Sequence, residues 1–105
     1  MTAEQQSRVA AFTDKHSLEN DPTTCLLDLV SETGELAKEI LQGSQYGQTK
    51  FQPASSWQGE LGDLFYSLIC LANSTQVNLD TALVDTLDKY QARIKRKGSP
   101  GSDKS

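Results

Sequence analysis

Apolar residues recur at spacings of three and four along four segments of this 105-residue chain, whereas alternating strand patterns hardly occur. Such spacing is typical of amphipathic α-helices, each with one apolar stripe that faces a core. It predicts helices over about residues 3–18, 21–43, 56–72 and 78–97. We therefore expect an all-α four-helix bundle in which the long second and third helices pair antiparallel.

The ends of these helices carry local signals. Asp21 followed by Pro22 is typical of a helix start, and Gly43 and Gly98 are typical of helix ends. The connection 43–56 is long and polar, which suits either a lid that faces a substrate or a flexible surface loop. The predicted core stripes of the last three helices comprise Leu26, Val30, Ala37 and Leu41, then Leu61, Leu64, Phe65, Leu68 and Ile69, then Leu79, Leu83, Leu87, Tyr90 and Ile94.

Size and charge restrict the class of protein. The length allows one domain, predicted over residues 1–97, and the small polar residues 98–105 are expected to form a disordered C-terminal tail. A domain this small buries little surface by itself, so self-association is expected. A net charge of −4 argues against a general nucleic-acid binder, because such proteins are normally basic.

The two cysteines and the longest uncharged run bear on the compartment. Cys25 and Cys70 are too few for a disulfide framework or a four-cysteine zinc site, and their apolar neighbours predict small buried side chains in a reducing compartment. The uncharged run 64–79 is too short and too polar to span a bilayer. The polar residues 4–6 stand where a signal peptide needs an apolar run. We therefore expect a cytoplasmic protein without a membrane partner.

A short motif occurs twice, once in each of the two central helices. Residues 32–36 read Glu-Thr-Gly-Glu-Leu and residues 60–64 read Glu-Leu-Gly-Asp-Leu, so both fit E-x-G-[E/D]-L. Carboxylates at i and i+3 are neighbours on one helical face, and a helical wheel places both pairs at the border of the apolar stripe. Pairing of the helices therefore predicts two acidic edges that face each other, formed by Glu32, Glu35, Glu60 and Asp63.

Each copy of the motif also contains a glycine, Gly34 or Gly62. A glycine inside a helix costs up to ~1 kcal/mol relative to alanine. Because the glycines stand at matching positions, we expect the two helix backbones to approach each other closely there.

Four carboxylates in one site require protons or cations. Each like-charged pair costs about 4 kcal/mol at ~4 Å and an effective dielectric of ~20. Oxygen ligands without His or Cys favour Mg²⁺ or Mn²⁺ over Zn²⁺. A di-iron bundle is excluded because it requires Glu-x-x-His pairs, and no histidine follows these acids. The alternative is that both acidic pairs lie on solvated helix faces.

Basic residues gather near the end of the last predicted helix, where Lys89, Arg93, Lys95, Arg96 and Lys97 make up half of the total. One interpretation is a phosphate clamp centred on Arg93. The other is favourable positive charge at a helix C-terminus. A metal cluster with basic residues indicates a polyphosphate ligand, and the lack of a G-x-x-x-x-G-K-[S/T] loop excludes a P-loop enzyme by motif. Metal-assisted hydrolysis of a phosphoanhydride fits these parts.

The paired motif resembles the signature of the MazG-like all-α nucleoside triphosphate pyrophosphohydrolases, which is E-x-x-E, a spacer and E-x-x-D. Here it reads Glu32-x-x-Glu35, twenty-four residues, and Glu60-x-x-Asp63. The flanking residues 31–40, 60–68 and 78–83 resemble the family's two acidic motifs and the start of its last helix. The likeness covers roughly residues 12–93.

The resemblance implies a MazG-like bundle that assembles as a homodimer or a homotetramer. It implies that Glu32, Glu35, Glu60 and Asp63 hold Mg²⁺, that Glu32 or Glu35 positions or deprotonates water, and that a (d)NTP is cleaved to a nucleoside monophosphate and pyrophosphate. Such an enzyme serves house-cleaning or control of the nucleotide pool. The expected substrate-binding residues are Lys38, Trp57, Lys89, Tyr90 and Arg93.

The sequence departs from this family at two places and leaves two rival functions open. Thr86 and Tyr90 stand where many relatives carry a lysine and an asparagine, so part of the family's phosphate contacts does not carry over, and Lys89 is the candidate to compensate. Gln42 stands where relatives selective for deoxycytidine triphosphate often carry an aromatic residue, so the base preference does not carry over. The enzymatic alternative is the related phosphoribosyl-ATP pyrophosphohydrolase. The non-enzymatic alternative is a helical interaction or regulatory module.

Overall fold

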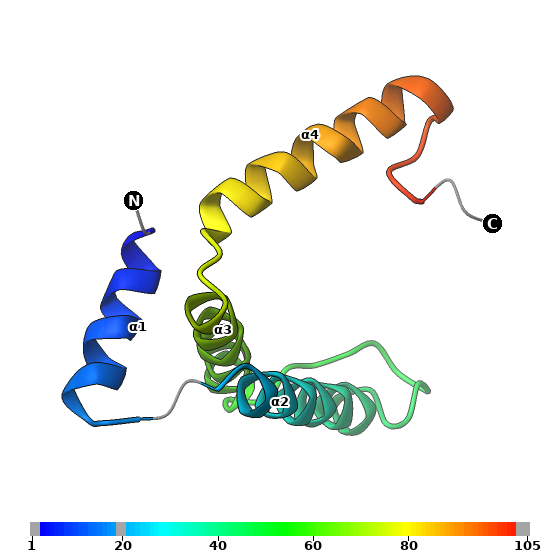
Figure 1. The fold of residues 1–105 in the computed structure, drawn as a ribbon. Coiled ribbons are helices and arrows are strands. Elements are labelled where there is room, and N and C mark those ends of the chain that lie inside the picture. Colours follow the sequence, from blue (N-terminus) through cyan, green and yellow to red (C-terminus); the bar gives the residue numbers. More distant parts are fainter. Residues whose placement is uncertain (1–2, 19–20, 103–105) are drawn as a thin grey trace.

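The computed structural model describes residues 3–18 and 21–102, which form four α-helices and no strand. Helix α1 spans Glu4–Lys15, α2 spans Pro22–Gly43, α3 spans Trp57–Ser74 and α4 spans Leu79–Lys97 (Figure 1). The all-α architecture predicted from the spacing of apolar residues is therefore confirmed.

Local side chains set the starts of α2 and α4. The Asp21 carboxylate accepts a hydrogen bond from the backbone N–H of Thr24 at 3.1 Å, and Pro22 occupies the first turn. Asn78 caps α4 in the same way, through the N–H of Thr81 at 3.1 Å. Each cap satisfies one of the backbone donors that a helix N-terminus leaves unpaired.

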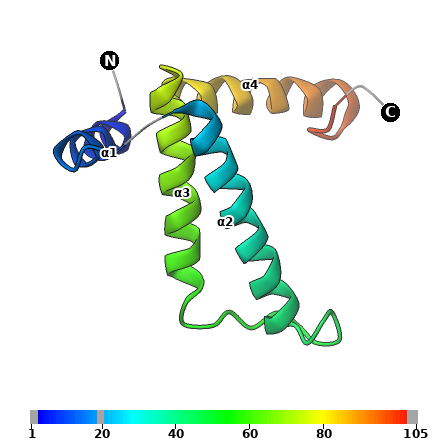
Figure 2. The same ribbon diagram turned by 60° about the horizontal axis from the view of Figure 1, so that its bottom comes forward.

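Helices α2 and α3 form the predicted long antiparallel pair, and α1 packs against α3 (Figure 2). Cys25 of α2 and Ile69, Cys70 and Ala72 of α3 are buried. Both thiols are free, and burial is the largest cause that raises the pKa of each. The two cysteines thus behave as the buried side chains expected from their apolar neighbours.

Much of the predicted core is exposed in the single chain, which corrects the expectation from the apolar stripes. Leu26 and Val30 of α2 are 49% and 60% exposed, and Phe65 of α3 is 50% exposed. The physical reason is that two paired helices cover only one side of each other, and within the described part of the chain α1 covers only a part of α3 while α4 packs extensively against neither helix.

Helix α4 leaves the end of α3 and projects away from the α2–α3 pair (Figure 1). Among residues 3–18 and 21–102, α4 packs extensively against no other helix. Its apolar residues Leu83, Val84 and Leu87 are 56–58% exposed. A face of this kind on a helix is typical of an interface that a single chain leaves open.

The connection between α2 and α3 folds back onto the end of α2. The N–H of Gln52 donates to the carbonyl of Gly43 at 2.9 Å. The rings of Phe51 and Trp57 meet edge to face with centroids 5.1 Å apart. The base of this connection is therefore attached to the helix pair, whereas Tyr46 near its tip is 73% exposed.

At the other end of the chain, Gly98 ends α4 in the left-handed conformation (φ 82°), as predicted. Beyond it, Lys97 Nζ donates to the carbonyl of Ser102 at 2.7 Å. The boundary at residue 97 and the disordered tail 98–105 remain predictions, and residues 1–2 and 103–105 lie outside the described residues. None of the described helices is long and apolar enough to cross a lipid bilayer.

Candidate metal centre

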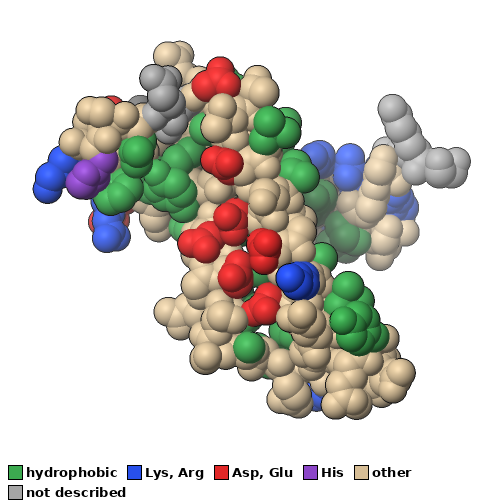
Figure 3. All heavy atoms as spheres, turned by 90° about the horizontal axis from the view of Figure 1, so that it is seen from below, with side chains coloured by type: hydrophobic (Ala, Val, Ile, Leu, Met, Phe, Trp, Pro, Cys, Tyr) green, Lys and Arg blue, Asp and Glu red, His purple; other side chains and the backbone are tan. Residues whose placement is uncertain are grey.

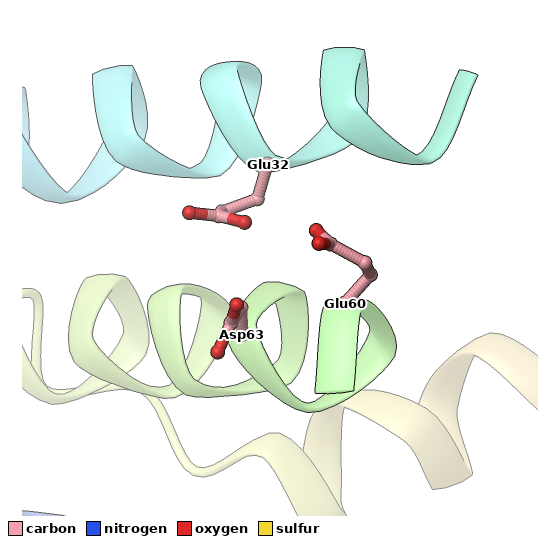
Figure 4. Close-up of side chains that lie close together, drawn as sticks. All are labelled: Glu32, Glu60 and Asp63. Carbon is pink, nitrogen blue, oxygen red and sulfur yellow. The ribbon is translucent and has the colours of Figure 1, made fainter. Parts of the chain in front are cut away.

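Three carboxylates from α2 and α3 converge between the two helices (Figure 4). Glu32, Glu60 and Asp63 each contribute one oxygen, and these three oxygens lie within 4.8 Å of one another. Glu32 and Glu60 are half-buried and Asp63 is exposed. Figure 3 shows the acidic side chains gathered on this face of the molecule.

The convergence follows from helix geometry. Glu60 and Asp63 stand at i and i+3, which places them on one face of α3. Glu32 comes from the antiparallel neighbour, at the height where the two acidic edges meet (Figure 4). The predicted meeting of two acidic edges therefore occurs for three of the four carboxylates.

The fourth carboxylate, Glu35, is exposed and does not belong to this group of three. It still lies close enough to Glu60 to raise the pKa of that carboxyl. Its position, one turn along α2 from Glu32, leaves it beside the three converging oxygens rather than among them.

The cluster changes the pKa of Glu60. Its pKa is raised above the ordinary value, first by desolvation and then by the negative charges of Asp63, Glu35, Glu32 and Glu39. Every one of these causes disfavours the ionised form, so a cation that neutralises the cluster would be stabilised here.

Glu39, one turn beyond Glu35 on α2, is held by a side chain from the start of α3. Ser56 stands at the N-cap position of α3 but makes no capping bond with its side chain. Its hydroxyl instead donates to Glu39 Oε1 at 2.6 Å. Ser56 therefore ties the start of α3 to α2 beside the acidic cluster, and only the contact across helices reveals this role.

The expected close approach at the motif glycines is wrong. A Cβ added to Gly34 or Gly62 would meet nothing within 4 Å. The close approach occurs at Gly43, where a Cβ would lie 2.7 Å from Phe51 Cε1 and 2.8 Å from the carbonyl oxygen of Gln52. The glycine required for packing is thus the one at the end of α2, where the connection folds back.

The predicted substrate-binding residues lie in two separate places. Lys38 is exposed on α2, and Trp57 at the start of α3 is half-buried against Phe51. Lys89 and Arg93 flank the ring of Tyr90 on α4, with Lys89 Nζ 5.6 Å and Arg93 Cζ 6.0 Å from its centroid.

These three residues of α4 therefore form a cation–π group on the projecting helix. Arg93 also donates from Nη1 to the carbonyl of Pro100 at 3.2 Å. Because α4 points away from α2 and α3, a single chain does not bring this group to the carboxylates (Figures 1 and 3).

The three carboxylates fit a small hard cation. Octahedral Mg²⁺ with ligands at about 2.1 Å places its ligand oxygens about 3 to 4.2 Å apart. The observed limit of 4.8 Å is only slightly larger, so small side-chain rotations would close the site. An all-oxygen set without His or Cys also matches the preference of Mg²⁺ and Mn²⁺.

An all-α chain with a carboxylate cluster between its two central helices has the architecture of a helical metal-dependent hydrolase. Comparison with known proteins identifies the family. The sequence model of the MazG nucleotide pyrophosphohydrolase domain matches residues 20–97. The chain therefore belongs to the MazG family, and the resemblance seen in the sequence is confirmed. The match leaves α1 outside it.

Relatives of known sequence and structure agree. The chain is 32% identical over 77 residues to the uncharacterised protein YpjD of Bacillus subtilis, a match that covers 70% of this chain and 68% of YpjD. The crystal structure of the Bacillus-conserved MazG protein, a nucleotide pyrophosphohydrolase, is similar with a TM-score of 0.68 and 30% identity over 86% of this chain and 93% of that one. The crystal structure of YpjD gives a TM-score of 0.71 and 30% identity over 89% of this chain and 95% of the other.

Proposed function

We propose that this protein is a Mg²⁺-dependent nucleoside triphosphate pyrophosphohydrolase that cleaves the bond between the α- and β-phosphates. The observation that carries the proposal is the convergence of Glu32, Glu60 and Asp63 within 4.8 Å between two helices of a MazG domain. Mn²⁺ is the alternative cation, since it prefers the same ligands.

In this reaction the oxygen of a water molecule bonds to the α-phosphorus while the α–β bridging bond breaks, which releases a nucleoside monophosphate and pyrophosphate. The bound cation would supply stabilisation of phosphate charge and easier loss of a proton from water. Glu32, Glu60 and Asp63 would hold it. Glu35, exposed beside them, is suited to orient the attacking water and accept its proton, with Glu32 as the other candidate.

The phosphate-binding cations are proposed to come from α4. Lys89, Tyr90 and Arg93 form one group, but a single chain holds them away from the carboxylates. We propose that the protein assembles as a homodimer or homotetramer, which would cover the exposed apolar face of α4 and bring basic groups to an acidic cluster. Lys38 and Trp57 would contribute contacts to the nucleotide from α2 and α3.

The proposed setting is the cytoplasm, with a house-cleaning or pool-controlling use and no nucleic-acid partner. The net charge of −4 supports the last point. Turnover of a substrate panel decides the base and sugar preference.

The test is release of pyrophosphate from a panel of ribo- and deoxyribonucleoside triphosphates and phosphoribosyl-ATP, with Mg²⁺ and with EDTA. We expect Mg²⁺-dependent turnover of at least one triphosphate, reduced about 10²-fold or more in Glu35→Gln. Glu4→Gln, an exposed acid on α1, serves as the matched control. Absence of turnover at high protein concentration would favour the interaction module, and turnover of phosphoribosyl-ATP alone would favour the enzymatic alternative.

A further inference from the structure

Gln6 of α1 is a buried polar side chain, 2% exposed, whose amide nitrogen and amide oxygen are both hydrogen-bonded. Its Nε2 donates to Asn73 Oδ1 at 3.0 Å and to the carbonyl of Val77 at 2.7 Å. Its Oε1 accepts from the backbone N–H of Leu79 at 2.7 Å. Asn73 Nδ2 returns a bond to the carbonyl of Gln6 at 3.1 Å.

These partners belong to three consecutive parts of the chain. Asn73 lies in the last turn of α3, Val77 lies in the turn and Leu79 is the first residue of α4. The N–H of a first helical residue has no partner within its own helix. A side chain of α1 therefore supplies a second cap for α4, beside the one that Asn78 provides, and it joins the turn to the end of α3.

Within a single chain, the direction of α4 depends on this turn more than on packing along the helix. Within the described part of the chain α4 packs extensively against no other helix. A cavity of about 460 Å³ separates Phe65 and Leu68 of α3 from Leu83 and Thr86 of α4. With little contact along its length, the helix points where its first residues are held.

A small rotation at the turn becomes a large displacement further along the helix. Arg93 lies about 20 Å from Leu79 along the helix axis, at 1.5 Å per residue. A rotation of about 15° at the turn would therefore move its backbone by about 5 Å. Such a displacement exceeds the tolerance of a hydrogen bond between Arg93 and a phosphate.

We propose that Gln6 is a positioning residue that fixes the direction of α4 and, through it, the place of Lys89, Tyr90 and Arg93 at the substrate phosphates. The role at the substrate phosphates rests on the proposed function, whereas the role in the direction of α4 does not. The proposal assigns a role at the site to α1, which lies outside the residues that the MazG domain matches.

The first experiment measures the direction of α4 without any assay of activity. Spin labels on Gln42→Cys at the end of α2 and Gln91→Cys on α4, in a Cys25→Ala and Cys70→Ala background, report one distance by pulsed electron paramagnetic resonance. Labelled chains are diluted with unlabelled ones so that only distances within one chain contribute. We expect Gln6→Leu to broaden the distribution or shift it by several ångströms.

The matched control is Ser7→Leu, which places the same leucine at the neighbouring exposed position of α1. It should reproduce the parent distribution. If Gln6→Leu also reproduces it, the proposal is overturned. Asn73→Leu removes one partner of Gln6 and retains the other two, so it gives the same change at smaller amplitude should Gln6→Leu not fold.

The second experiment measures whether the direction of α4 affects binding of the substrate phosphates. We expect Gln6→Leu to raise the KM for the best triphosphate about tenfold or more, with a smaller change in kcat, because the carboxylates of α2 and α3 stay in place. An unchanged KM beside a broadened distance distribution would overturn the link to the substrate. If the parent protein turns over nothing, the proposed function fails while the distance measurement still decides the role of Gln6.

Discussion

Glu32 and Glu60 face each other across the α2–α3 pair, and their carboxylate oxygens approach within 4.8 Å together with one from Asp63 (Figure 4). Like charges at this separation repel, and this repulsion adds to desolvation, the largest cause, in raising the pKa of Glu60. The same arrangement that destabilises the protein without a cation creates the site in which a cation would bind.

Magnesium is expected to stabilise the fold through this site. A ligand at 100 times its Kd contributes about 2.7 kcal/mol when it binds only the folded state. In a domain of this size that corresponds to a rise in Tm on the order of 10 °C. Differential scanning calorimetry in Mg²⁺ and in EDTA measures the difference, which should disappear in Asp63→Asn and persist in Asp14→Asn, an exposed acid on α1. An equal response of the two variants would contradict the site.

Removal of the Glu60 charge is expected to stabilise the protein in EDTA. Because the pKa of Glu60 is higher in the folded state, the folded state holds the proton more tightly. The penalty is therefore absent below the unfolded pKa of about 4.3 and fully present above the raised folded pKa. Glu60→Gln should have a higher Tm than the parent protein at pH 7, and the difference should vanish towards pH 4.

Two controls sharpen the Glu60 measurement. Glu4→Gln makes the same chemical change in the first turn of α1, away from the cluster, and should not raise the Tm. In saturating Mg²⁺ the order of Glu60→Gln and the parent protein should reverse, because the variant loses a ligand. A Glu60→Gln variant that melts below the parent protein in EDTA at pH 7 would show that the cluster carries no repulsive strain.

Gly43→Ala is expected to destabilise the protein by about 1–3 kcal/mol, the cost of overpacking. The new Cβ would meet Phe51 Cε1 at 2.7 Å and the Gln52 carbonyl at 2.8 Å, and a backbone atom cannot rotate away. Gly34→Ala is the matched comparison, because its Cβ would enter open space in α2 and should gain up to ~1 kcal/mol of helix propensity. Urea unfolding measures both, and equal effects of the two substitutions would contradict the assignment.

The exposed face of α4 is expected to be an interface between copies of the chain. Leu87 is 56% exposed, and burying a leucine contributes about 1.5–3 kcal/mol. Leu87→Glu should therefore weaken association about tenfold or more. Light scattering over a concentration series measures this, with Gln91→Glu as a control that adds the same charge at a polar exposed position. A parent protein that stays monomeric at high concentration would rule out the assembly.

The sequence predicts those parts of the fold that depend on neighbours along the chain. The spacing of apolar residues gives the four helices, Asp21 caps the helix that follows it, and the i, i+3 spacing gives the acidic edges. These features are local, so the sequence around each residue contains the information.

Contacts between distant residues are what the sequence does not reveal. Gln5 and Gln6 are indistinguishable in a polar run, yet one is exposed and the other is buried against residues more than 65 positions away. The register of α1 on α3 decides which of them is buried. The expected close approach at Gly34 and Gly62 was wrong for the same reason, because the spacing of these glycines says nothing about which residues lie opposite them.

The hydrogen bond from Gln52 to Gly43 and the contact between Phe51 and Trp57 close the α2–α3 connection at its base. The loop that contains Tyr46 is therefore closed by these contacts before it reaches α3. This property is useful for labelling. An epitope tag or a fluorophore inserted after Tyr46 would lengthen a closed loop, while α2, α3 and the carboxylates between them would keep their arrangement.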